Sequence, residues 1–598
     1  MTDLNLAAIG NCVIAALVEP AGRISWCCFP RLDGAPVFCS LLAGAQSHES
    51  GFFDIEVENL KAASQSYVGN SAILTTMLTD ETGAAVRIVD FAPRYRRHGR
   101  MFRPSQIIRR VEPVSGSARV RVRIRPRFGY GREAPEIRGE SNHIRYAGSE
   151  MTLRVTTDAP LSYVVGETWF VLDSPVTLIL GRDEVVAGAL PALSREYLDE
   201  TQDYWTEWAR YLSVPFEYQD AVIRAAITLK LCSFEETGAI VAALTTSVPE
   251  HANSGRNWDY RYCWLRDAYF VVQALNRLGA TRTMEDYIRY ITNVAALEPE
   301  GNLKPVYGVV PDADLAERIE HGLAGYRGMG PVRVGNQAHA QVQNDGYGAV
   351  ILAAAQMFFD RRLPRAGDAD LFARLERLGE RALALALTPD AGPWEFRGRT
   401  AVHTYSAAMC WAACRRLARI ATHLGRNERA TYWRDAAAAL RRAILDSAWN
   451  PKLGSFVASF GGEDVDASLL LLHEIGFVAA SDPRFLGTVA AIEERLRCGD
   501  YLYRYRTADD FGVPETAFVV CTFWYIDALT AIGRREEARA IFERTLARRN
   551  ATGLLSEDIA PATGELWGNF PQTYSMVGLI VSAMRLSKTW EEAFWRDS

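Results

Sequence analysis

The sequence predicts a chain of two parts, an N-terminal antiparallel β-sandwich followed by a larger domain built from helices. Hydrophobic residues recur with a period of two up to about residue 190, and they follow the helical period of 3.6 from about residue 217. The length of 598 residues also exceeds the roughly 100 to 200 residues usual for one compact domain. We therefore expect a β-sandwich domain over residues 1–192, a linker helix over 193–215 and a helical domain over 216–598.

The first part is predicted to consist of short strands joined by tight turns. Turn-forming Gly, Asp, Asn and Ser separate the strands in DETGAA, VSGSA and RGESN. Regular short strands with such turns are typical of an antiparallel sandwich. The segment 194–212 then has apolar residues at helical intervals and is expected to form the connecting helix. The strands are expected in RISWCCF, FFDIEVE, AVRIVDF, ARVRVRIRPRF, HIRYAG, MTLRVTT and VTLILG.

The second part contains about twelve helical segments, many of them rich in Ala, Leu and Arg. Twelve helices make six antiparallel hairpins, and six hairpins can close into a ring of inner and outer helices. The loops at one end of such a ring would form a pocket, because functional side chains collect on loops held by a rigid scaffold. The segments are 218–236, 266–279, 283–297, 343–361, 369–387, 405–423, 426–447, 466–475, 484–497, 514–532, 534–548 and 573–587.

Composition excludes several classes of function. The net charge is −6, and no basic stretch is present that would attract nucleic acid or an anionic membrane surface. No segment reaches the roughly 18 apolar residues of a membrane span. The N-terminus has no early positive region, and Gly10 and Asn11 interrupt its apolar run, so no secretory signal is expected.

The ten cysteines lie in apolar contexts such as ISWCCFP and AAMCWAACRR, without the spacing of zinc ligands. We interpret them as reduced core cysteines, which favours a cytoplasmic location. His339 has no second histidine at ligand spacing and is interpreted as a structural residue. We therefore predict no metal and no cofactor. A homo-oligomer is compatible with the sequence, which carries no signal for or against one.

The segment NWDYRYCWLRDAYF, residues 257–270, is the most informative motif. It combines an Arg266–Asp267 pair at a predicted helix start with several aromatic rings. Flat rings stack on sugar faces, and charged pairs take hydrogen bonds from neighbouring hydroxyls. The motif therefore predicts a sugar site, although a buried ion pair near the positive end of a helix dipole is an alternative. The rings are Trp258, Tyr260, Tyr262 and Trp264.

Two later loops each carry a glutamate of interest. Glu395 follows Trp394 in GPWEFRG, where the indole would desolvate the carboxyl group and favour its neutral, proton-donating form. Glu557 lies in GLLSEDIAPATGELWGNFPQTYS, where it could hold a water molecule. A pair of separated carboxyl groups in an aromatic cleft is what cleavage of a glycosidic bond requires. The alternatives are a Glu395 ion pair with Arg397 or Arg399 and a capping role for Glu557.

Taken together, these motifs resemble glycoside hydrolase family 15, the glucoamylase family with its bacterial trehalase and glucodextranase relatives. IGNCVIAALVEPAGRISWCCFPRLDG is similar to the opening of bacterial members, and NWDYRYCWLRDA is similar to their substrate-binding segment. PWEFRG with HTYSAAMCW resembles the segment that carries the general acid. GLLSEDIAPATGELWGNFPQTYS resembles the segment that carries the general base.

The resemblance implies a β-sandwich followed by an (α/α)6 barrel and hydrolysis with inversion of configuration. It implies that Glu395 is the general acid and that Glu557 is the base that activates water. For inversion, the two carboxyl groups should stand about 6.5 to 9.5 Å apart. The residues implied to bind the substrate are Trp264, Arg266, Asp267, Tyr307, Trp394 and Arg397.

Three positions depart from the family pattern. Met576 stands where relatives often have His, Ala407 where they often have Lys, and Trp567 where a smaller aliphatic residue is usual. Both predicted catalytic carboxyl groups are present, so we expect these departures to affect the part of the site that holds the leaving group.

The resulting prediction is an exo-acting, inverting α-glucoside hydrolase that releases β-glucose from the non-reducing end of a small substrate. Trehalose is placed slightly ahead of short malto- or isomalto-oligosaccharides, because a cytoplasmic enzyme meets small α-glucosides rather than external starch. Two alternatives are a glucoside phosphorylase on a similar toroid, which would need no base at Glu557, and a non-catalytic glycan sensor.

Overall fold

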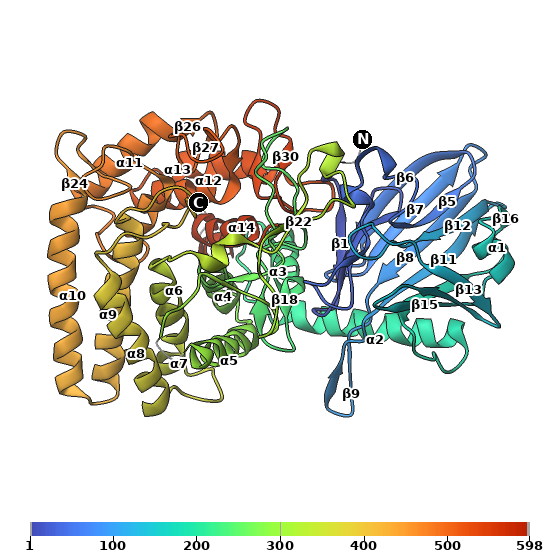
Figure 1. Cartoon of the computed structure of the whole chain (residues 1–598), viewed down its shortest axis with the longest axis horizontal. Coiled ribbons are helices and arrows are strands. Elements are labelled where there is room, and N and C mark those ends of the chain that lie inside the picture. Colours follow the sequence, from blue (N-terminus) through green and yellow to red (C-terminus); the bar gives the residue numbers. More distant parts are fainter. Residues whose placement is uncertain (1–2, 299–300, 595–598) are drawn as a thin grey trace.

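The computed structural model describes residues 3–298 and 301–594 and places two domains side by side (Figure 1). The N-terminal domain consists of two stacked antiparallel sheets. One sheet has the order β1 (Ala7–Gly10), β2 (Ala15–Val18), β3 (Ile24–Cys28), β5 (Phe52–Val57), β12 (Arg119–Arg125) and β16 (Phe170–Val171), with β4 (Pro36–Phe38) beside β3. The other has the order β13 (Glu136–Glu140), β14 (His143–Ala147), β15 (Thr152–Thr157), β17 (Val176–Arg182), β11 (Gln106–Ser115), β8 (Ala85–Phe91), β7 (Leu74–Asp80) and β6 (Leu60–Tyr67).

The sandwich was predicted correctly, and each of its seven predicted segments contains a strand. The alternation of apolar residues in the sequence did not identify strands β1, β2, β6, β7 and β11. Strand β6 lies at a sheet edge with most side chains exposed, so it lacks apolar alternation. Strand β11 carries Arg109, which is fully buried and bonds to Asp90 of β8 at 2.8 Å. A buried charge that is paired across the sheet breaks the apolar pattern without breaking the strand.

Helix α2 (Leu190–Arg210) follows the sandwich and runs along it towards the second domain (Figure 1). The second domain is an (α/α)6 barrel, as predicted. Its inner helices are α4 (Leu265–Arg277), α6 (Asp345–Ala354), α9 (Thr404–His423), η5 (Ala467–Leu472), α12 (Val519–Ala531) and α14 (Thr573–Leu586). Its outer helices are α3 (Gln219–Leu231), α5 (Thr281–Leu297), α8 (Ala369–Leu385), α10 (Asn427–Ala448), α11 (Pro483–Leu496) and α13 (Arg535–Leu546).

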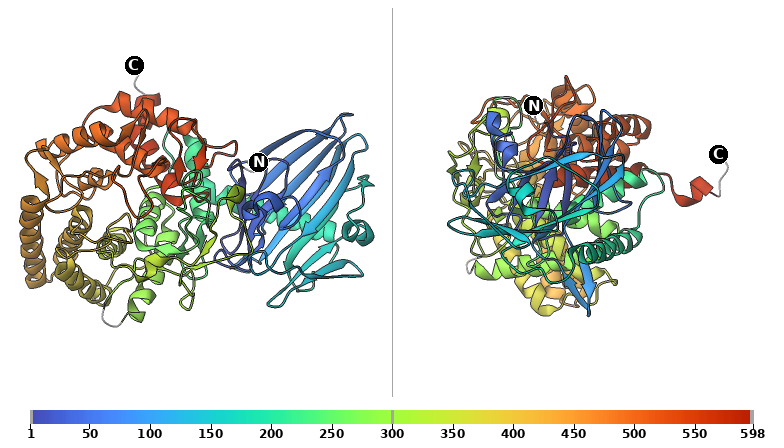
Figure 2. Two further views of the ribbon diagram at one scale, coloured as in Figure 1. Left: turned by 45° about the horizontal axis from the view of Figure 1, so that its top comes forward. Right: turned by 90° about the vertical axis from the view of Figure 1, so that its right-hand side faces the viewer.

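The ring closes because α14 packs against both α3 and α4 (Figure 2). All twelve predicted helical segments are found among the described residues. Two of them differ in detail, since η5 is a short 3-10 helix and the segment of α6 continues as a separate turn, α7 (Gln356–Phe359). Inner helices such as α6 and α12 are buried on nearly every side, whereas outer helices such as α8 and α10 bury one face. Amphipathic helices on the outside of a ring give this contrast.

The hydrophobic core of the barrel extends onto one face of the first sheet. Alternate residues of strands β1 to β3 point in opposite directions, so Ala7 and Ile9 enter the sandwich core, whereas Ala8 and Trp26 enter the core of the barrel. The indole N–H of Trp26 donates to the carbonyl of Leu244 in the barrel at 2.8 Å. The first sheet therefore has no solvated face at this junction, which explains why ISWCC is buried throughout.

The ten cysteines are all free thiols, and each is buried except Cys498, which is partly exposed. The expectation of reduced core cysteines is thus confirmed. Among the described residues, no helix combines the length and apolarity needed to cross a membrane.

Candidate active site

A cavity lies at the N-terminal ends of the inner helices. The cavity is lined by Tyr405, Ser468 and Tyr574, which lie in the first turns of α9, η5 and α14, respectively. The six inner helices begin at the same end of the ring because each αα unit returns the chain to that end. Their N–H groups and dipoles therefore face the same space, which favours acceptor groups and partial negative charge there.

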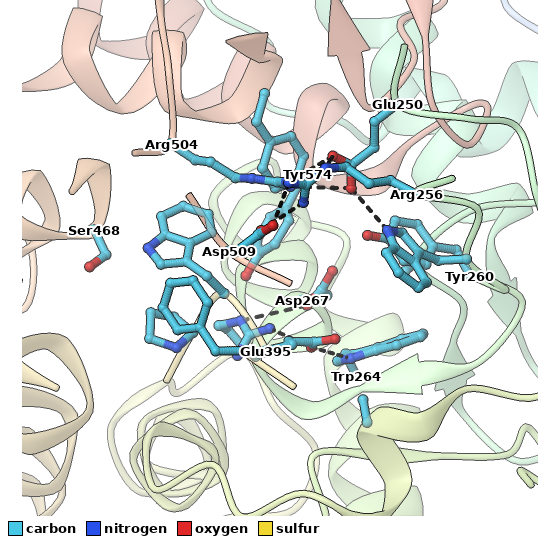
Figure 3. A pocket seen from close by; sticks show the side chains of 18 of the residues that line it. Glu250, Arg256, Tyr260, Trp264, Asp267, Glu395, Ser468, Arg504, Asp509 and Tyr574 are labelled. Carbon is cyan, nitrogen blue, oxygen red and sulfur yellow. Dashed lines mark hydrogen bonds and ion pairs between the residues drawn. The ribbon is translucent and has the colours of Figure 1, made fainter. Parts of the chain in front are cut away.

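Arg266, in the first turn of α4, organises the floor of this cavity. Its guanidinium group donates to Glu395 Oε1 at 3.0 Å, to Gln343 Oε1 at 2.8 Å and to Asp345 Oδ2 at 3.3 Å. The indole N–H of Trp264 donates to the same Glu395 oxygen at 2.6 Å (Figure 3). The two motifs that the sequence singled out, 257–270 and 392–398, therefore meet at one carboxyl group. Glu395 pairs with Arg266 rather than with a neighbour in its own loop.

Asp267 points into the cavity next to Arg266, but the two form only a distant pair at 4.0 Å. Its Oδ2 has no hydrogen-bond partner among the described residues, and the same holds for the hydroxyls of Tyr405 and Tyr574. All three residues line the cavity and are almost completely buried. Burial, opposed by the charge of Arg266, raises the pKa of Asp267 to about 7. Unpartnered polar atoms around a buried pocket are suited to take the hydroxyl groups of a sugar.

Glu557 precedes the short strand β29 (Asp558–Ile559) and is completely buried. Its Oε1 accepts from the Tyr260 hydroxyl at 2.7 Å, and its Oε2 accepts from the backbone N–H of Asn569 at 3.2 Å. Tyr260 lines the cavity, whereas Glu557 is not among the lining residues. Burial, together with the neighbouring Asp558 and Glu250 carboxyl groups, holds the pKa of Glu557 well above its ordinary value. Glu557 is thus connected to the cavity through Tyr260.

A second charged group, which the sequence analysis did not identify, forms another part of the wall. Glu250 bonds to Arg504 at 2.6 Å and accepts from the Trp258 indole at 2.9 Å. Arg256 makes a two-pronged contact with Asp509 at 2.7 and 2.5 Å. In Figure 3 this group lies apart from Glu395 and Trp264. Glu250 and Arg504 lie 254 positions apart in the sequence, so no local sequence pattern relates them.

Trp394 and Arg397 both line the cavity, as the sequence analysis expected of substrate-binding residues. The Trp394 indole donates to Asp466 at 2.9 Å. The Arg397 guanidinium group lies 4.4 Å from the centre of the Trp258 ring and pairs with Glu317 at 2.6 Å. At this part of the cavity wall, the Trp258 ring is therefore covered by a guanidinium group whose charge is neutralised by Glu317.

Tyr307 lies outside the cavity. It is on β21 (Val306–Tyr307), which pairs with β20 (Cys263–Trp264), and its hydroxyl accepts from the backbone of Lys304 at 2.8 Å. Of the three departures from the family pattern, Ala407 and Met576 are fully buried in α9 and α14. Trp567 packs edge-on against Tyr326. None of these four residues is among those that line the cavity.

No group of three or more His, Cys, Asp or Glu side chains in the described residues is arranged to hold a metal ion.

Comparisons with known proteins place this chain in a family. The sequence model described as "Glycosyl hydrolases family 15" matches residues 217–584, and that described as "Trehalase-like, N-terminal" matches residues 4–163. Proteins named trehalase from Thermoplasma volcanium and Mycobacterium tuberculosis are 32% and 31% identical to it, over 97% and 96% of this chain and 93% and 88% of their own. A crystal structure of a bacterial glucoamylase complexed with acarbose covers 98% of this chain and 94% of its own, with a TM-score of 0.68 at 14% identity.

The protein is therefore an O-glycosyl hydrolase with a β-sandwich and an (α/α)6 barrel. Within that class, the chain belongs to glycosyl hydrolases family 15.

Proposed function

We propose that the protein is an exo-acting, inverting α-glucosidase and that trehalose is its first candidate substrate. The observation that carries this proposal is the arrangement of Glu395 at one side of a cavity whose floor presents the unpartnered polar atoms of Asp267, Tyr405 and Tyr574. Such a floor suits one terminal glucose. The relatives named trehalase, which match over almost the whole chain, support the choice of trehalose over malto- and isomalto-oligosaccharides as the first candidate.

Glu395 is proposed as the general acid. Its Oε1 accepts from both Trp264 and Arg266, so we place the transferable proton on Oε2. As the bond between the anomeric carbon and the leaving oxygen breaks, this proton passes to the oxygen. Arg266 and Trp264 then stabilise the carboxylate that remains, because both already donate to it.

Glu557 is proposed as the general base. The Tyr260 hydroxyl donates a hydrogen bond to Glu557, and Tyr260 lines the cavity. We therefore place the attacking water beside this hydroxyl. The water oxygen bonds to the anomeric carbon from the face opposite the leaving group. The Tyr260 hydroxyl takes one water proton and gives its own proton to Glu557 Oε1. Attack from the opposite face inverts an α-linkage and releases β-glucose.

The test is incubation of the purified protein with trehalose, maltose, isomaltose and a longer maltodextrin, each with and without phosphate, followed by proton NMR. Because the leaving glucose of trehalose keeps its α configuration, we expect equal initial amounts of α- and β-glucose from trehalose, and an initial excess of β-glucose from any malto- or isomalto-oligosaccharide that is cleaved. We expect activity to fall by several orders of magnitude in Glu395→Gln and Glu557→Gln. Glucose 1-phosphate that forms only with phosphate would show a phosphorylase. Tight binding of a sugar without turnover would show a sensor, and initial release of α-glucose alone from trehalose would contradict inversion.

A further inference from the structure

A loop at residues 503–516 crosses from β27 (Tyr501–Leu502) to β28 (Ala517–Phe518) at the cavity. It supplies a substantial part of the cavity wall. The loop residues that line the cavity are Arg504, Tyr505, Asp509, Asp510 and Phe511.

The middle of this loop contacts the segment that carries the aromatic motif. Asp509 accepts from both terminal nitrogens of Arg256 and from the Tyr505 hydroxyl, the latter at 2.5 Å. The ring of Phe511 meets the ring of Trp258 edge-on, with centroids 5.0 Å apart. These contacts hold the neighbouring Asp510 in a defined position.

Asp510 makes a different contact, with the loop that carries Glu395. Its Oδ2 accepts from the backbone N–H of Arg397 at 2.9 Å and from that of Gly398 at 3.0 Å. The carboxyl group lies so close to Gly398 that a Cβ atom there would stand 2.2 Å from Asp510 Oδ1. One charged side chain therefore holds the two peptide groups that follow Phe396 and Arg397.

This contact matters because the backbone at Glu395 is strained. Its φ angle is +60°, in the left-handed region that a residue with a Cβ atom rarely adopts. Such a conformation persists only where the surroundings over-determine it. The Glu395 N–H donates to the carbonyl of Gly392 at 3.2 Å, and the Phe396 N–H donates to the carbonyl of Ala391 at 3.1 Å. Gln341 donates to the Glu395 carbonyl at 3.1 Å. Asp510 restrains the next two peptide groups along the chain.

We propose that Asp510 is a positioning residue for the general acid, which it aims by holding the backbone N–H groups two and three residues after Glu395. This inference rests on the proposed role of Glu395. Asp510 would act on protonation of the leaving group and not on binding of the terminal glucose. The distinction can be measured, because substrates differ in how much their leaving group needs a proton.

The test compares Asp510→Ala with the wild type on two substrates, the best α-glucoside of the panel above and α-glucosyl fluoride. Fluoride departs without a proton, whereas a sugar alkoxide does not. We expect kcat for the α-glucoside to fall by about 10- to 100-fold and kcat for the fluoride to change by less than about threefold. Asp510→Asn keeps one acceptor oxygen and should give an intermediate loss, and it carries the test if the alanine variant does not fold.

The matched control is Val513→Ala, an exposed change in the same loop, which should leave both rates unchanged. Equal losses on both substrates would overturn the proposal, because a general disturbance of the site does not depend on the leaving group. An unchanged rate on the α-glucoside would overturn it as well. Failure of the proposed function is seen separately in the wild type, since a protein that cleaves only the fluoride has no working acid to position.

Discussion

At the scale of the residue, Asp267 illustrates a conflict between stability and function. It is buried with an unpartnered oxygen, and burial raises its pKa from 3.8 to about 7. The folded protein therefore keeps a proton that the unfolded chain has lost between about pH 4 and pH 7. The free energy of unfolding falls as the pH rises through this range. A carboxylate kept without a partner is best explained by a ligand that supplies one.

We expect Asp267→Asn to be more stable than the wild type at pH 7.5, by about 1 to 3 kcal/mol, and to bind the substrate poorly. The gain in stability should shrink as the pH falls from 7 to below 4, because the wild-type carboxyl group is protonated in both states only below its unfolded pKa of 3.8. Chemical unfolding at a series of pH values gives the comparison. Asp446→Asn, an exposed change on α10, is the control and should leave stability unchanged. A stability gain that does not depend on pH would contradict this account.

A second prediction concerns Glu250, whose negative charge helps to raise the pKa of Glu557. A base must be deprotonated to act, so activity should fall as the pH drops through this raised pKa. We expect Glu250→Gln to lower the pKa of Glu557 and to move the acidic limb of kcat/KM to lower pH by roughly 0.5 to 1 unit. Release of Arg504 from its partner acts in the same direction.

The measurement is the pH profile of kcat/KM on the best substrate. Glu317→Gln serves as the comparison, because Glu317 pairs with Arg397 and is not among the groups that act on Glu557. Its acidic limb should stay in place. An acidic limb of Glu250→Gln that stays in place or moves to higher pH would show that another group sets it.

At the scale of the element, the turn after β30 (Leu566–Trp567) determines where Glu557 lies. Gly568 has a φ angle of +75°, and a Cβ atom there would stand 2.6 Å from the Cβ atom of Glu557 and 2.7 Å from its Oε2. Gly568 also donates to the carbonyl of Pro249 at 2.8 Å, which connects this turn to the Glu250 segment. The close approach requires a glycine for steric reasons as well as for its backbone angle.

We therefore expect Gly568→Ala to push Glu557 aside and to lower kcat by about 100-fold, because displacements of about 1 Å have effects of that size. KM should change little. Gly533→Ala is the matched control, since Gly533 has a φ angle of +91° but no atom near its Cβ position. Gly533→Ala should lose about 1 kcal/mol of stability from backbone strain, and Gly568→Ala should lose about 1 to 3 kcal/mol more from overpacking. Steady-state kinetics and thermal unfolding of the pair separate displacement of Glu557 from backbone strain, and equal kcat values would contradict the expectation.

The elements themselves were largely predictable. Helix α4 begins at Leu265, so Arg266 and Asp267 lie in its first turn as the motif predicted. Strand β6 was not predicted, because an exposed edge strand needs no apolar alternation. The short helix η5 was predicted as an ordinary helix, because apolar residues in ASLLLL do not distinguish the two kinds of turn.

At the scale of the whole molecule, a buried ion cluster connects the domains. Glu235 of the barrel accepts from Arg94 of the sandwich at 2.7 Å and from Arg103 at 2.8 Å, and it pairs with Lys230. Burial alone would raise the pKa of Glu235, but Lys230 and Arg94 outweigh it and hold the pKa well below its usual range. The glutamate neutralises cations that would otherwise be buried without a partner.

We expect Glu235→Gln to lower the free energy of unfolding by about 3 to 5 kcal/mol, because it leaves these buried cations unpaired. Glu196→Gln breaks an exposed ion pair with Arg97 and should cost less than about 1 kcal/mol. Urea unfolding followed by tryptophan fluorescence gives both values. Similar small losses in the two variants would show that the cluster does not hold the domains together.

The sequence by itself determined the order of sandwich and helices, because the period of apolar residues is a local property that each segment carries on its own. It also identified Glu395 and Arg266 as candidates, since aromatic and charged residues gather in their segments. Only the tertiary structure decided that Arg266 binds Glu395, that Glu557 lies behind Tyr260 and that Tyr307 lies outside the cavity. Contacts such as that of Glu250 with Arg504 join loops far apart in the chain, and they exist only once the ring of helices has closed.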